Sequence, residues 1–102
     1  MPLRPKSPRP TPLDRERAET IALAALVFLA EDAGRLGRFL ALTGIGPAEL
    51  KGGADTAAVQ VAVLDHLLAD ESLLLTFAAN AGQPAQMIGM ARQLLDNCPG
   101  EG

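Results

Sequence analysis

The sequence lacks several features that stabilise or activate other small proteins. It contains one cysteine, Cys98, so no disulfide can form within the chain, and this usage fits a reducing compartment such as the cytoplasm. Tyrosine and tryptophan are absent, which leaves phenylalanine as the aromatic residue. No stretch alternates apolar and polar residues as a half-buried strand does, and this argues against a β-sheet.

Long hydrophobic runs are also missing. The apolar run at residues 21–30 is about half the roughly 20 residues that a transmembrane helix needs. Asp14, Glu16 and Glu19 precede this run, where a secretory signal would carry basic residues, and no small-residue cleavage site follows it. We therefore expect neither a membrane span nor a signal peptide, and we expect a cytoplasmic protein.

Sequence motifs for catalysis and cofactor binding are absent as well. There is no phosphate-binding P-loop, no dinucleotide-binding fingerprint and no pair of carboxylates in a pattern that suggests a cleft. Cys98 has no histidine at a recognisable spacing, and neither Thr43 nor Ser72 has a base beside it. The sequence therefore predicts no catalytic residue and no cofactor, and we expect that the protein is not an enzyme.

The single histidine, His66, has acidic neighbours. Asp65 adjoins it and Asp70 follows four residues later, which is the spacing of a helix-surface pair. A metal site would need a third ligand, and Glu71 is the nearest further candidate. We interpret His66 as part of a surface pair with Asp70 and predict no metal site.

The charges that are present are divided unevenly along the chain. The formal net charge is −3. Residues 1–12 carry Arg4, Lys6 and Arg9 and no acid, so the remaining residues are strongly acidic. An acidic body repels nucleic acid and anionic membranes, and this argues against both as partners.

Prolines dominate the first twelve residues. Pro2, Pro5 and Pro8 follow the three-residue period of a polyproline II helix, and each removes a backbone hydrogen-bond donor. We predict a disordered basic tail over residues 1–12 and a second disordered tail over residues 97–102. The N-terminal tail could serve as a basic arm or as a docking peptide, but a solvated tail without a role is the favoured interpretation.

The sequence between these tails predicts an all-α domain over residues 13–96. Alanine and leucine, both strong helix formers, supply about a third of the chain. Apolar periodicity with glycine and proline punctuation predicts an orthogonal bundle of five to six short helices. Their expected ranges are residues 11–32, 35–43, 47–51, 56–69, 71–81 and 84–96. Thr11 is expected as the N-cap of the first helix with Pro12 at its first position, and either Asp55 or Thr56 as the N-cap of the fourth.

Two of these helices are apolar on more than one face. In the first helix one stripe is expected to face the core, and it consists of Ala18, Ile21, Ala22, Ala25, Phe28 and Leu29. Leu23 and Val27 lie on the other side, and the fourth helix is apolar almost all round, with Val61 and Leu64 among its residues. We predict that Leu23, Val27, Val61 and Leu64 form an interaction surface for a protein partner or for a second copy in a homodimer. The alternative is that the other helices cover both faces.

Two similar turns separate the helices, one within residues 39–50 and one within residues 77–88. Gly44 and Gly82 are expected to end helices in the left-handed conformation, the first of them in a Schellman motif. Pro47 and Pro84 are expected to begin the next helices. The second turn is one residue shorter than the first. Independent use of glycine and proline at helix ends is favoured over an internal duplication.

The first of these turns also suggests an alternative function. Gly44, Ile45 and Gly46 are similar to the hairpin of helix–hairpin–helix DNA-binding modules, in which backbone N–H groups bind phosphate. With the basic tail, the turn could make the protein a nucleic-acid accessory factor. The acidic surroundings, with Glu49 close by and Lys51 the nearest base, favour a structural helix cap.

A family resemblance rests on two segments. ETIALAALVFLAEDAGRLGRFLALTGIGPAEL and VLDHLLADESLLLTFAANAG resemble a short family of uncharacterised alphaproteobacterial proteins, a domain of unknown function, over about residues 13–95. Members of this family usually carry one more residue between the second glycine and proline, here Gly82 and Pro84. The resemblance implies a small helical bacterial protein, and it brings no activity, cofactor or catalytic residue.

Overall fold

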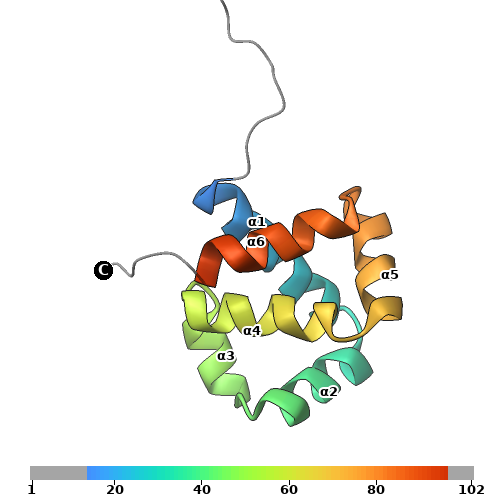
Figure 1. Cartoon of the computed structure of the whole chain (residues 1–102). Helices are drawn as coiled ribbons and strands as arrows, with labels where there is room; N and C mark the ends of the chain where they lie inside the picture. Colours follow the sequence, from blue (N-terminus) through green and yellow to red (C-terminus); the bar gives the residue numbers. More distant parts are fainter. Residues whose placement is uncertain (1–13, 97–102) are drawn as a thin grey trace, which may run out of the picture.

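The computed structural model of the chain describes residues 14–96, and this range contains six α-helices and no β-strand (Figure 1). The predicted all-α bundle is therefore confirmed, whereas the predicted tails lie outside the described residues. The helices are α1 (Arg15–Ala30), α2 (Ala33–Thr43), α3 (Pro47–Gly53), α4 (Ala57–Leu68), α5 (Glu71–Ala81) and α6 (Ala85–Asp96).

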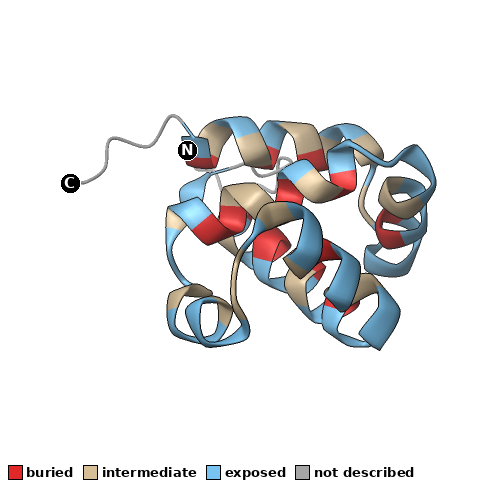
Figure 2. Cartoon of the chain, turned by 90° about the horizontal axis from the view of Figure 1, so that it is seen from below, coloured by how far each residue is buried: buried red, intermediate tan, exposed pale blue. Residues whose placement is uncertain are grey.

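Helices α1, α4 and α6 form the centre of the bundle. They make the most extensive contacts with one another, and α2, α3 and α5 pack at the periphery. In Figure 1, α4 and α6 lie side by side, α1 crosses behind them, and α5 stands steeply across their ends. Figure 2 shows the buried positions on the sides of the helices that face one another.

The core stripe predicted for the first helix is confirmed. Its six residues, three of which are alanines, are all buried. Small side chains at a helix contact let the helix axes approach closely, and this suits a helix that packs against both α4 and α6. The remaining core residues come from the other helices: Phe39, Val59, Val63, Leu64, Leu67, Phe77, Ala78, Ile88, Ala91 and Leu95.

All three phenylalanines are buried and lie in aromatic contacts that join helices. The rings of Phe28 in α1 and Phe77 in α5 are 5.4 Å apart between centroids and tilted by 55°. Phe39 of α2 meets His66 of α4 edge-on, at 5.3 Å and 77°. Such pairs contribute about 0.5–1.5 kcal/mol beyond the burial of their area. The two pairs thus fix the peripheral helices α5 and α2 against the centre.

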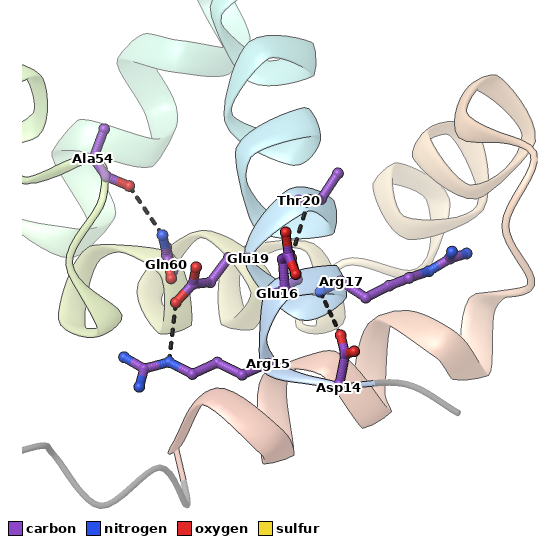
Figure 3. A network of polar contacts seen from close by, with 8 residues as sticks. All are labelled: Asp14, Arg15, Glu16, Arg17, Glu19, Thr20, Ala54 and Gln60. Carbon is purple, nitrogen blue, oxygen red and sulfur yellow. Dashed lines mark hydrogen bonds and ion pairs between the residues drawn. The ribbon is translucent and has the colours of Figure 1, made fainter. Parts of the chain in front are cut away.

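The first helix begins later than predicted. Its N-cap is Asp14, whose Oδ1 accepts a hydrogen bond from the backbone N–H of Arg17 at 2.9 Å (Figure 3). The prediction of Thr11 as N-cap was wrong, because Asp14 is extended and its carboxylate satisfies a donor of the first turn. In the same way Asp32 caps α2, which therefore begins at Ala33 rather than at Arg35.

The two glycine turns share a backbone conformation but differ in their hydrogen bonds. Gly44 and Gly82 are both left-handed, with φ of 76° and 67°. The N–H of Gly44 donates to Leu40 O at 2.9 Å, which is the simple αL motif. At the second turn Gln83 N donates to Ala78 O and Gly82 N to Ala79 O, which is the Schellman motif. The Schellman motif was therefore predicted at the wrong turn.

Helix α3 is the least anchored helix of the bundle. None of its residues is buried, and Leu50 is its partly buried contact with the core. Pro47 begins the helix as predicted, but the helix continues to Gly53 instead of ending at Lys51. At the other glycine turn, α6 begins one residue after Pro84.

Gln60, at the start of α4, is the one buried polar residue in the described range. Its Nε2 donates to Ala54 O at 3.4 Å, a long hydrogen bond that connects α4 to the end of α3 (Figure 3). Its Oε1 is buried and has no hydrogen-bond partner within residues 14–96. A buried acceptor without a partner lowers stability, because folding removes its hydrogen bonds to water and provides no other hydrogen bond instead.

We predict opposite effects for two Gly→Ala substitutions, one inside α2 and one at the glycine that follows its last residue. Gly44→Ala should lower the free energy of unfolding by about 1 kcal/mol, because alanine at φ 76° is strained although its Cβ would meet no atom. Gly37→Ala is the matched control: Gly37 lies inside the same helix with open space at its Cβ, and alanine there should add about 0.5–1 kcal/mol. Urea denaturation measures both, and equal effects would contradict the left-handed cap.

Replacing Gln60 by methionine should leave stability unchanged or raise it by about 0.5–1 kcal/mol. Methionine has a similar shape, removes the unpartnered oxygen and gives up a long hydrogen bond to Ala54, which is itself partly exposed. Thermal and urea denaturation of the two proteins test this. A loss of more than 1 kcal/mol would show that the Gln60 amide is fully hydrogen-bonded.

Candidate functional site

The predicted interaction surface divides into an exposed part and a buried part. Leu23 and Val27 on α1 are 47% and 54% exposed, respectively. Val61 is partly buried against the core, and Leu64 is completely buried. Including Leu64 was wrong, because α1, α5 and α6 all pack against α4 and cover its second apolar face. The face that remains, Leu23, Ala24 and Val27, is called the α1 face below.

A hollow of about 180 Å³ adjoins the α1 face. It lies between α1 and α5 and is lined by Ala24, Val27, Phe28, Glu31, Phe77, Asn80 and Ala81. The two aromatic residues are the buried ring pair of the core, so the wall of this α1–α5 hollow is fixed by core packing. Val27 belongs to both the face and the hollow, which makes them one continuous apolar area.

The size of the hollow indicates what it can accept. Pockets for small molecules and cofactors usually measure about 300–1,000 Å³ and enclose most of the ligand. The α1–α5 hollow is smaller, and it opens beside an exposed helix face. This geometry suits the insertion of one apolar side chain from a protein partner.

One acidic side chain and the C-terminal ends of two helices lie at the hollow. Glu31 directly follows α1, its side chain is exposed, and it forms no ion pair within residues 14–96. Asn80 and Ala81 belong to the last turn of α5, and neither α1 nor α5 has a basic residue in its last turn. Since helix C-termini carry partial negative charge, the hollow lies at two negative helix ends.

Arg35 supplies positive charge near the end of α1, but it is engaged within the bundle. Its guanidinium carbon lies 4.2 Å from the centroid of the Phe28 ring, and Nη1 donates to Phe28 O at 3.2 Å. The contact satisfies a carbonyl of the last turn of α1 and adds a cation–π interaction. This contact between Arg35 and Phe28 was not predicted from the sequence. It holds the positive charge of Arg35 close to the end of α1.

The turn at residues 44–46 does not have the free donors that a phosphate site needs. Gly44 N donates to Leu40 O, Ile45 N to the hydroxyl of Thr43 at 3.3 Å, and Gly46 N to Oε1 of Glu49 at 3.3 Å. All three N–H groups are thus occupied, and a carboxylate lies on the third. The geometry supports the structural cap and not the phosphate-contact alternative.

His66 lies at a second hollow, of about 490 Å³, which is lined by Arg38, Leu42, His66, Ala69, Asp70, Glu71 and Ser72. The surface pair predicted with Asp70 was wrong. Oδ1 of Asp70 accepts from Leu73 N and caps α5, while the imidazole packs against Phe39. Partial burial and the nearby Arg38 lower the pKa of His66, and Asp70 only partly opposes them.

The described residues assemble no group of metal ligands. Within residues 14–96, no three side chains of His, Cys, Asp or Glu are placed to hold an ion together. Cys98, the single cysteine of the sequence, lies outside this range. No helix of the described range combines the length and the apolar character required to cross a bilayer.

One polar network was missed by sequence reasoning. Arg92 of α6 forms a two-point ion pair with Asp65 of α4, with Nε to Oδ1 at 2.6 Å and Nη2 to Oδ2 at 3.2 Å. Nη1 of Arg92 also binds Asp96 at 3.2 Å. No local signal marks a pair 27 residues apart. Both partners are substantially exposed, so the pair orients α6 on α4 and adds little stability.

A protein-family model matches the chain over most of its length. The model of a family described as "Protein of unknown function (DUF3572)" matches residues 15–98. No curated protein and no solved structure matches the chain. The match covers all six helices and both glycine turns.

The lowered pKa of His66 predicts a pH dependence of stability. The folded state holds His66 neutral to a lower pH than the unfolded state does, so its contribution is present above about pH 6.5 and is lost as pH falls through the folded pKa. Urea denaturation at pH 7.5 and pH 5.5 should show lower stability at pH 5.5. His66→Gln should reduce this difference, and an unchanged difference in the variant would contradict the assignment.

Proposed function

The chain belongs to the DUF3572 family, described as proteins of unknown function, and we propose that it is a non-enzymatic protein–protein interaction module. The α1 face and the α1–α5 hollow form its binding surface. The observation that carries the proposal is the continuity of exposed Leu23 and Val27 with a hollow whose wall is the aromatic core.

The distinction between scattered and contiguous apolar residues supports the proposal. Single exposed leucines or valines are common on protein surfaces and need no explanation. Leu23 and Ala24 are exposed on one turn of α1 and Val27 on the next, and both Ala24 and Val27 line the adjoining hollow. Each large residue could still bury about half of its surface in a complex, worth on the order of 1 kcal/mol.

Two kinds of occupant fit this surface, a different protein or a second copy of the chain in a homodimer. The opposite side of α1 is packed into the core, so either occupant would meet a rigid helix. A nucleic-acid role is not proposed, because the amides of residues 44–46 already have partners within the chain.

We also propose a bacterial origin, in the alphaproteobacteria, and a cytoplasmic location. The first is supported by the resemblance of the segments around FLALTG, and the second by the single cysteine. A cytoplasmic interaction module needs no disulfide, cofactor or metal for its role.

The experiment is a double substitution on the α1 face with a matched control. Leu23→Glu with Val27→Glu should abolish retention of a partner or self-association, because each carboxylate would lie in the apolar contact. Leu75→Glu with Met90→Glu is the control: these residues are 51% and 54% exposed and do not line the hollow. Both variants should stay within about 0.5 kcal/mol of the parent stability.

The readouts are light scattering at several concentrations and affinity purification from native cytoplasm. The proposal predicts an oligomer or a retained protein with the parent and the control, and its loss with the α1-face variant. A parent that is monomeric throughout and retains nothing would overturn it. Equal losses in both variants would place the interaction elsewhere.

A further inference from the structure

The charges around the α1–α5 hollow restrict what can bind there. The hollow is lined by the apolar residues Val27, Phe28 and Phe77, and also by the carboxylate side chain of Glu31 and the amide side chain of Asn80. Neither polar group has a hydrogen bond or ion pair from its side chain to another residue in the range 14–96. A group bound in the hollow would therefore meet an unpaired acid next to an apolar wall.

The backbone adds to this negative character. Val27, Phe28 and Glu31 come from the last turn of α1 and its C-cap, and Asn80 and Ala81 come from the last turn of α5. Both helices end without a basic residue of their own, so their terminal dipoles are not neutralised from within these turns. Arg35 keeps its positive charge in its contacts with the Phe28 ring and Phe28 O, but it does not line the hollow, so Glu31 is the charged group among the lining residues.

We propose that the α1–α5 hollow binds a basic segment of a partner protein, with one large apolar side chain in the hollow and an adjacent lysine or arginine on Glu31. This inference rests on the proposed interaction function and specifies the chemistry of the partner. The apolar side chain supplies the binding energy, and the cation supplies specificity, since complementary rim charges mainly select partners and speed association.

The same charges argue against a second copy as the occupant. If two α1 faces paired antiparallel with Leu23 opposite Val27, Glu31 of one copy would lie opposite Glu19 of the other, whose charge is already engaged by its ion pair with Arg15 at 3.0 Å, so Glu31 would gain no unpaired cation. In a parallel pair, Glu31 of one copy would face Glu31 of the other. A basic partner avoids this repulsion. The acidic balance of the described range, with 6 basic and 11 acidic residues, would also attract such a partner from a distance.

An unbiased peptide selection tests the proposal. A phage-displayed library of random 12-residue peptides is panned against the immobilised full chain, after depletion on the Val27→Glu variant. We expect enriched peptides to carry a leucine, isoleucine, methionine or phenylalanine within two positions of a lysine or arginine. Titration of one such synthetic peptide into the ¹⁵N-labelled chain should shift the amide signals of Ala24, Val27, Glu31, Asn80 and Ala81.

Charge reversal then tests the role of Glu31. Glu31→Lys should weaken binding of the selected peptide about fivefold to tenfold, measured by fluorescence anisotropy. Asp55→Lys is the control, because it makes the same change in net charge at an exposed loop position away from the hollow, and it should change binding less than twofold. Equal weakening by both variants would show only a general charge effect and would overturn the assignment to Glu31.

The outcomes separate this inference from the proposed function. Peptides that depend on Val27 but lack basic residues would overturn the basic partner and leave an interaction module. Self-association that requires Leu23 and Val27 would also overturn the basic partner and leave an interaction module, because a second copy would then be the occupant. No peptide that depends on Val27, together with a monomeric chain that retains no protein, would count against both.

Discussion

The close packing of α1 against α4 and α6 is the constraint on which the rest of the structure depends. Ala18, Ala22 and Ala25 keep the contact side of α1 narrow, so two helices can pack against it at once. Helices α1 and α6 bury two sides of α4, and the helices α2, α3 and α5 close the periphery. Because α1 has one buried face, its opposite side is the only part of the helix that remains for a partner.

The candidate site is a consequence of that core and not an addition to it. Phe28 and Phe77 pack together to hold α5 against α1, and the same two residues form the wall of the hollow. Arg35 strengthens this corner by bonding the end of α1 and covering the Phe28 ring. An interaction surface that shares its wall with the core is rigid before binding, and preorganisation of this kind lowers the cost of association.

Much of the fold could be predicted from local patterns, and the errors have local causes. The six buried residues of α1 follow from helical periodicity, and the left-handed Gly44 and Gly82 follow from glycine at helix ends. Thr11 and Asp14 are both good caps, and the sequence does not decide between them. The Schellman bonds are at Gly82 instead of Gly44, because at the first turn the Thr43 hydroxyl accepts the N–H of Ile45.

The sequence by itself determined the all-α character of residues 14–96, the order of their helices and the core face of α1, and it left open whether Leu23 and Val27 are covered. Those properties depend on residues within one or two helical turns of each other. The tertiary structure decided the rest: it buried Leu64, turned His66 toward Phe39, paired Asp65 with Arg92 and placed Asn80 and Glu31 in the lining of one hollow. Crossing helices set these contacts between residues far apart in the chain, and periodicity within a single helix contains no information about which helix will cover it.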